Sequence, residues 1–222
     1  MRIINSFVGF MQEGGFFMYP ILLILALGLA IAVERFLYLS TTKNSNVKTW
    51  KEMLPLIEKG RFSEAMAAAS NSGAAVGKIL AYGLSRLKSS VQRDAIETAM
   101  EEGLMEIVPR LEKRTHYLAT FANISTLLGL LGTVAGLIAA FAAVANADPA
   151  QKAELLSSSI SVAMNCTAFG LGSAIPLMLL YSFLQSKTTE LVDSLEMVSV
   201  KFLNMLQEQA IQHQTQKDGS TA

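Results

Sequence analysis

The sequence predicts an all-α integral membrane protein with three transmembrane helices, of which the second and third are long and extend into a cytoplasmic helical domain. Two apolar stretches, 118–145 and 156–184, exceed the roughly 20 residues that span a bilayer and contain no Asp, Glu, Lys or Arg. A third apolar stretch, 16–33, is expected to cross as well. Hydrophobic residues make up 51% of the chain and charged residues 16%, which favours an integral membrane protein.

The first span is expected at 16–39, after a periplasmic or interfacial segment at 1–15. Pro20 is tolerable because it lies near the start of the helix. The apolar run ends in Glu34 and Arg35 and has no small-residue cleavage site, so we expect a retained anchor and not a signal peptide.

Residues 40–116 are predicted to form the cytoplasmic helical domain. Lys and Arg are frequent there, and the positive-inside rule then leaves only Arg2 and Lys152 outside. The expected topology is an N-terminus outside and a C-terminus in the cytoplasm. Helices are predicted at 47–58, 62–69, 76–87 and 91–115. We expect the last of these to run unbroken into the second span, with a kink at Pro109.

The second half of the chain is expected to form a membrane hairpin followed by a cytoplasmic helix. The second span is placed at 117–146, a short periplasmic loop at 147–155 and the third span at 156–186. At 187–210, apolar residues alternate four and three apart, which predicts an amphipathic helix that continues the third span. The polar residues 211–222 are expected to be disordered.

Small residues and hydroxyls gather on one face of each long span. In the second span this stripe holds Gly129, Gly132, Gly136, Ala140 and Ala143, bordered by Thr126 and Thr133. In the third span it holds Ala163, Thr167, Gly170 and Ala174. One interpretation is close helix packing, with each Thr bonded to its own backbone. The other interpretation is an oligomer that surrounds a further, unidentified component. The presence of matching stripes on two spans favours this interpretation.

The sequence lacks the patterns of enzyme chemistry. It has no glycine-rich phosphate loop, no metal-ligand cluster, two histidines and one cysteine, so we expect neither an enzyme nor a bound cofactor or metal. The zero net charge argues against nucleic acid as a partner. The second and third spans hold no ionisable group for proton transfer, so a titrating acid would have to come from another chain.

Two motifs resemble those of a known family. LLGLLGTVAGLIAAF, at 127–141, looks like the second-span signature of the MotA/TolQ/ExbB family of ion-driven motor subunits. AMNCTAFGLGSAIP, at 163–176, resembles its third-span signature, close to A-x-x-x-T-A-x-G-L-x-x-A-I-P. The likeness extends to Glu34 and Arg35 and to the three-span layout, so it covers most of the chain.

The resemblance implies a ring, usually a pentamer, that encloses two helices of a single-span partner of the MotB/TolR/ExbD type with a membrane aspartate. Thr133 and Thr167 match the two family threonines that face this aspartate. Gly132 and Gly136 would let the partner helix approach, and Pro176 would shape the cytoplasmic end of the third span. We expect an ion pathway or partner-facing surface formed by Thr133, Thr167, Thr126, Gly132, Gly136, Ala140, Ala163, Gly170 and Ala174.

Two departures from the family pattern matter. TolQ- and ExbB-like members often carry a glutamate where this chain has Val162, and many read Ala-Pro-Leu-Leu-Gly where this chain has residues 125–129, STLLG. The coupling ion is expected to be H⁺, with Na⁺ as the alternative. Three outputs fit the motifs: Tol-like envelope maintenance, ExbB-like energising of outer-membrane uptake, and gliding motility. A non-conducting scaffold that positions a single-span partner is the competing interpretation.

Overall fold

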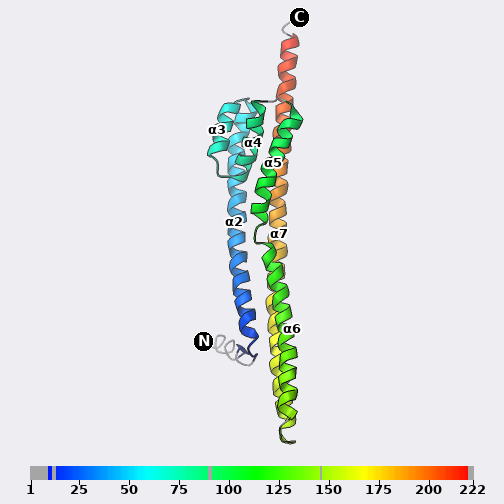
Figure 1. Ribbon diagram of the computed structural model, residues 1–222. Helices are drawn as coiled ribbons and strands as arrows, with labels where there is room; N and C mark the ends of the chain where they lie inside the picture. The colour runs from blue at the N-terminus through cyan, green and yellow to red at the C-terminus, as the bar shows by residue number, and fades with distance from the viewer. Residues whose placement is uncertain (1–9, 12–13, 90–91, 146, 220–222) are drawn as a thin grey trace. The chain divides into compact units, whose positions relative to one another are not determined.

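The computed structural model describes residues 10–11, 14–89, 92–145 and 147–219, and within this part of the chain every regular element is an α-helix. The helices are α2 (Met18–Glu58), α3 (Phe62–Asn71), α4 (Ala75–Leu87), α5 (Arg93–Glu112), α6 (His116–Ala145) and α7 (Lys152–Gly219) (Figure 1). Among the described residues, three helical stretches, in α2, α5–α6 and α7, are long and apolar enough to cross a membrane. The all-α fold with three candidate spans is therefore confirmed.

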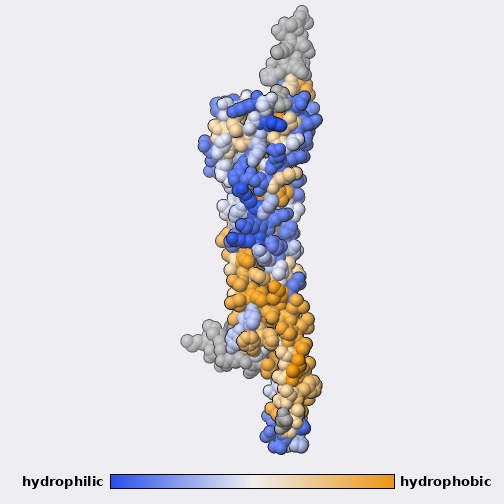
Figure 2. Space-filling model, in the orientation of Figure 1, coloured by the Kyte–Doolittle hydropathy of each residue, from blue (hydrophilic) through white to orange (hydrophobic). Residues whose placement is uncertain are grey.

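The chain divides into two compact units. The membrane unit is Met1–Arg35 with Arg114–Leu184, and the polar unit is Phe36–Lys113 with Gln185–Ala222. Hydrophobic side chains gather over the membrane unit and hydrophilic ones over the polar unit (Figure 2). The predicted interfacial segment 1–15 lies largely outside the described residues.

The first span packs on α7 within the membrane unit. Met18 and Ile21 are fully buried and form a cluster with Cys166 of α7, against which Phe169 also packs. Two turns further along α2, a Cβ at Gly28 would lie 2.5 Å from Leu177 Cδ2. Small residues let transmembrane helices approach closely, so Gly28 admits the Leu177 side chain at this contact.

The polar unit is a helical cluster with its own core. Helix α4 packs on both α3 and α5, and its buried face includes Ile79, Leu80 and Leu84. A Cβ at Gly83 would meet Met100 of α5 at 2.9 Å and Phe202 of α7 at 3.1 Å, which places this end of α7 in the same core. Burial of such side chains supplies about 1.5–3 kcal/mol each and holds these short helices together.

Polar contacts fix α2 and α7 to this cluster. Asn46 of α2 accepts the backbone N–H of Val76 at 3.3 Å, and the hydroxyls of Thr49 and Ser72 lie 3.0 Å apart. Near the end of α2, Gln209 Nε2 of α7 donates to the carbonyl of Ile57 at 2.7 Å. These bonds add to the packed core, since buried polar groups are stable when they have hydrogen-bond partners.

Helix boundaries agree with the sequence where the chain carries a breaker. Helix α2 ends at Glu58, two residues before Gly60, whose φ of +68° favours glycine because it has no Cβ. Helix α3 begins at Phe62, as predicted, and ends two residues beyond the predicted 62–69. Helix α4 begins one residue before the predicted 76–87 and ends with it.

Two stretches are more continuous than predicted. Helix α2 runs from the first span through residues 40–46, where no helix was predicted, and joins the predicted helix 47–58. Helix α7 continues the third span, as expected, and remains helical to Gly219, whereas the sequence predicted disorder from 211. Residues 40–46 and 211–218 contain no Gly or Pro, so nothing in the backbone chemistry interrupts the helix there.

The prediction of an unbroken helix from 91 into the second span is wrong. Helix α5 ends at Glu112, α6 begins at His116, and the turn between them holds Arg114 at a φ of +69°. Pro109, where a kink was expected, lies inside the last turn of α5. The Arg114 guanidinium lies 3.5 Å from the Glu34 carboxylate of α2, so an ion pair joins this turn to the end of the first span.

Candidate functional site in the hairpin of α6 and α7

The backbones of α6 and α7 touch at a pair of glycines. A Cβ built on Gly170 of α7 would lie 2.7 Å from the carbonyl oxygen of Ser125 and 2.9 Å from the Cα of Gly129. A Cβ on Gly129 would lie 3.2 Å from the Cα of Gly170. Both glycines are buried, and the atoms they would meet are backbone atoms that cannot rotate away. Only residues without a side chain fit this crossing.

The remaining small residues of the stripe extend the same contact. A Cβ on Gly132 would lie 2.3 Å from the sulfur of Cys166, and one on Gly136 would lie 2.8 Å from the Cβ of Ala163. Gly132, Ala140 and Ala163 are buried. The stripe from Gly129 to Gly136 is thus occupied by the other helix of the same hairpin, as in the close-packing interpretation, whereas Ala143 at its end is exposed.

The first span covers the contact near the start of α6. Ala174 and Leu177 of α7 are buried in a cluster with Ala122 of α6, and Leu25 of α2 packs against that cluster. The side chain of Val162 lies 3.4 Å from where a Cβ on Gly15 would sit. Val162, which stands where TolQ- and ExbB-like members often carry a glutamate, therefore makes an apolar contact near the start of the first span.

The three predicted threonines differ in what their hydroxyls bond. Thr167 Oγ1 donates across the hairpin to the Gly129 carbonyl at 2.8 Å. Thr126 and Thr133 each donate within α6, to Ala122 O at 3.1 Å and to Leu130 O at 2.6 Å. All three side chains are partly buried. Thr167 thus ties the two helices together, whereas Thr126 and Thr133 bond only their own helix.

Two buried serines mark a polar spot that the sequence analysis did not single out. Ser125 of α6 and Ser173 of α7 are 0% and 1% exposed, and neither hydroxyl has a hydrogen-bond partner among the described residues. Burying an unpaired hydroxyl costs about 1–3 kcal/mol. Their burial could have been predicted from their place beside the small-residue stripe, because a serine side chain is small enough to pack there.

Pro176 lies within α7 without ending it. The helix is continuous from Lys152 to Gly219 although proline lacks the N–H that would bond one turn back. Transmembrane helices tolerate proline because neighbouring groups can satisfy the freed carbonyl. No group of His, Cys, Asp and Glu in the described part of the chain could hold a metal ion.

Comparisons with known proteins identify the family. The model of the MotA/TolQ/ExbB proton channel family matches residues 71–197, which hold α6, the hairpin turn and the membrane half of α7. A biopolymer transport protein ExbB homologue of Methanothermobacter thermautotrophicus is 32% identical over 191 residues, which are 84% of this chain and 66% of the relative.

Two bacterial proteins show the same likeness. The Tol-Pal system protein TolQ of Haemophilus influenzae is 33% identical over 57% of this chain and 58% of its own length. The biopolymer transport protein ExbB of Aquifex aeolicus is 32% identical over 50% of this chain and 72% of its own length. The chain thus spans less than two thirds of the first two relatives. With its three apolar helices and the family match over more than half of its length, the chain belongs to the MotA/TolQ/ExbB proton channel family and is a multi-pass inner-membrane protein.

Proposed function

We propose that this chain is a proton-channel and motor subunit that couples an ion-motive force to work on the cell envelope, together with a single-span partner of the TolR/ExbD type. Family membership supports this proposal. The observation that carries it is the absence of Asp, Glu, Lys and Arg from 118–145 and 156–184. Proton transfer through a bilayer needs an ionisable group at depth, so the partner would supply it as an aspartate.

The proposed assembly is a ring of identical subunits, a pentamer around two partner helices, with the N-terminus in the periplasm and the C-terminus in the cytoplasm. The excess of Lys and Arg in 40–116 supports this orientation. H⁺ is the proposed coupling ion and Na⁺ the alternative. The relatives named ExbB and TolQ make biopolymer transport and the Tol-Pal system the two proposed outputs.

Thr133 is the hydroxyl best suited to meet the partner aspartate. Its Oγ1 donates to Leu130 O, so its proton is engaged and its oxygen lone pairs can accept from a protonated carboxyl. An ionised carboxylate only accepts, so the Thr133 proton would have to turn from Leu130 toward it. The hydroxyl would in this way follow the protonation state of the aspartate.

Thr167 is proposed to act at the same surface, but its hydroxyl also holds the hairpin through Gly129 O. Substituting Thr167 therefore removes a structural bond together with any contact to the partner. Substituting Thr133 removes only a bond within one turn of α6, so Thr133→Val is the cleaner test of an ion-pathway role. Thr120 makes a comparable bond to His116 O at 3.4 Å outside the motifs and offers a matched control.

The test is proton uptake into liposomes that hold the chain with and without its single-span partner, under an imposed gradient. We expect flux only with the partner, and its loss in Thr133→Val but not in Thr120→Val. Full flux in Thr133→Val would remove the role proposed for that hydroxyl. No flux from an intact, unplugged complex would instead favour the non-conducting scaffold.

A further inference from the structure

A second site of a different kind lies in the polar unit, between α2, α4 and α5. A cavity of about 260 Å³ is lined by side chains of these three helices and by the turn before α4. All of its lining residues belong to the polar unit: Tyr38, Thr41, Thr42, Ser45, Gly73, Ala74, Ala75, Lys78, Ile107, Arg110 and Leu111. The site is therefore independent of the α6–α7 hairpin.

The charge around this cavity is one-sided. Lys78 and Arg110 supply two cations, and no Asp or Glu is among the described residues that line it. Arg110 forms an ion pair with Glu106 at 2.7 Å through one nitrogen, which leaves its other N–H donors available. Lys78 is exposed and makes no ion pair within the described part of the chain. Glu106 thus neutralises part of the Arg110 charge, and Lys78 supplies a cation with no acidic partner among the described residues.

Neutral donors add to the cations. The hydroxyls of Thr41, Thr42 and Ser45 lie on successive turns of α2 and make no side-chain hydrogen bond to another described residue. The N-terminus of α4 also opens here, with Ala74 as its N-cap and no acidic residue in its first turn. The N–H groups of Ala74 and Val76 already donate to Ser72 Oγ and Asn46 Oδ1, so the positive end of the helix dipole is what favours an anion here.

A buried amide at the same α2–α4 contact holds the start of α4 beside the cavity. Asn46, next to Ser45, is 4% exposed, and its Oδ1 accepts the N–H of Val76 in the first turn of α4. Its Nδ2 has no hydrogen-bond partner among the described residues. Asn46 does not line the cavity, so its part here is to position the first turn of α4.

We infer that this cavity binds a phosphate group, held by Lys78, Arg110, the three hydroxyls of α2 and the N-terminus of α4. Lys and Arg together with backbone N–H groups are the donors that recognise phosphate in proteins. The phosphate belongs either to an anionic lipid headgroup or to a soluble phosphate. Tyr38 and Thr41 lie at the end of the predicted first span, where basic pockets meet lipid headgroups.

Two substitutions remove the proposed affinity without disturbing a packed side chain. Lys78→Gln removes an exposed cation. Gly73→Asp places a carboxylate at the cavity wall, where an added Cβ would meet nothing within 4 Å. Lys88→Gln is the matched control, because Lys88 is exposed at the other end of α4 and does not line the cavity.

The experiment measures binding to the full-length protein purified in detergent. Native mass spectrometry compares phosphatidylglycerol with phosphatidylcholine, and calorimetry measures inorganic phosphate. We expect Lys78→Gln and Gly73→Asp each to weaken binding by about tenfold, and Lys88→Gln to leave it unchanged. Binding of phosphatidylglycerol alone assigns the site to a lipid headgroup, and binding of inorganic phosphate assigns it to a soluble ligand.

Either assignment supports a phosphate site. Wild-type protein that binds neither probe would overturn the inference, as would variants that bind as tightly as the wild type. Equal melting temperatures of the wild type and the variants ensure that a loss of binding is not a loss of fold. Proton flux plays no part in this readout, so the result is independent of the proposed channel function.

Discussion

Thr167 of α7 donates a 2.8 Å hydrogen bond to the carbonyl of Gly129 in α6, beside the place where Gly170 meets the backbone of the same helix. The carbonyl of Gly129 already accepts within α6 as part of the helix, and carbonyl oxygens have a second lone pair for such a bond. A direct side-chain bond and a glycine contact thus meet within one turn of each helix. This crossing is the best-defined feature of the membrane unit.

Thr167→Val should lower the stability of the hairpin by about 1 kcal/mol, because it keeps the shape and removes the interhelical bond. Thr167→Ser should restore most of the loss. Thr126→Val is the control, since Thr126 bonds only Ala122 of its own helix. Thermal unfolding in detergent, followed by circular dichroism, gives the comparison. Equal midpoints for Thr167→Val and Thr126→Val would mean that the interhelical bond does not stabilise the protein.

Gly170→Ala should destabilise the membrane unit by about 1–3 kcal/mol, since the new methyl group would lie 2.7 Å from a carbonyl oxygen and force the helices apart. Gly172→Ala is the matched control two residues away, where a Cβ meets nothing within 4 Å. The same unfolding assay separates them. Equal unfolding midpoints for the two variants would mean that α6 and α7 do not approach each other at Gly170 as closely as the structure shows.

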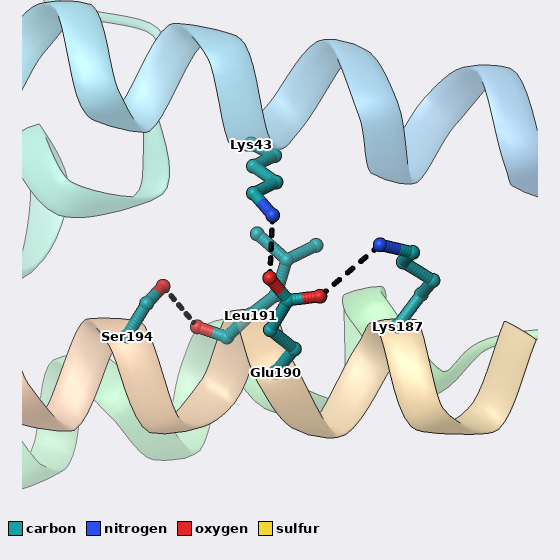
Figure 3. Close-up of polar contacts among 5 residues, drawn as sticks. All are labelled: Lys43, Lys187, Glu190, Leu191 and Ser194. Atoms are coloured by element: carbon teal, nitrogen blue, oxygen red, sulfur yellow. Dashed lines mark hydrogen bonds and ion pairs between the residues drawn. The ribbon is translucent and has the colours of Figure 1, made fainter.

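Glu190→Gln should weaken the polar unit near neutral pH. The Glu190 carboxylate accepts from Lys43 of α2 at 2.5 Å and from Lys187 at 3.2 Å (Figure 3), and these two bonds lower its pKa from the ordinary value of 4.5. A lowered pKa means that the pairing stabilises the fold above pH 4.5 and that this contribution is lost as the pH falls through the folded-state pKa.

The melting temperatures of the wild type and Glu190→Gln should therefore differ slightly at pH 7 and converge in acid. Both partners are about half exposed, so added salt should reduce the difference as well. Glu196→Gln, an exposed carboxylate on the same helix, should change nothing at either pH. A difference that does not shrink as the pH is lowered below 4.5 would contradict the ion-pair explanation.

Arg114→Gly and Arg114→Val should have opposite effects on stability. A positive φ costs a residue with a Cβ about 1–2 kcal/mol, and glycine escapes this cost. The ion pair with Glu34 is about half exposed and contributes little, so its loss in Arg114→Gly should be offset. Unfolding midpoints should rank Arg114→Gly at or above the wild type and Arg114→Val below it. The reverse order would exclude a positive φ at this turn.

Much of the helical architecture could be predicted from the sequence. Apolar length gives the spans, and Gly60 gives the end of α2 because glycine is the usual residue at a positive φ. The turn at Arg114 could not be predicted, since Lys, Arg and Thr are ordinary helix residues and carry no signal of a break. Pro109 suggested a kink five residues before Arg114, but α5 continues through this proline.

The small-residue stripe shows a different limit of sequence reasoning. Gly132 and Gly136 predict that some helix comes close, but their spacing does not say which one. The structure puts Cys166 and Ala163 of the same chain against them. The roles of Thr133 and Thr167 toward a partner rest on the family motif and stay predictions, because a hydroxyl bonded within the chain can also meet a second chain.

Only residues 146–151 separate α6 from α7, the two helices that make the glycine contact. Closing so few residues takes far less time than the encounter of two membrane proteins. Each chain would thus form its hairpin before it meets any other chain. A defect at Gly129 or Gly170 should therefore reduce the amount of folded monomer in the membrane, whatever that monomer later binds.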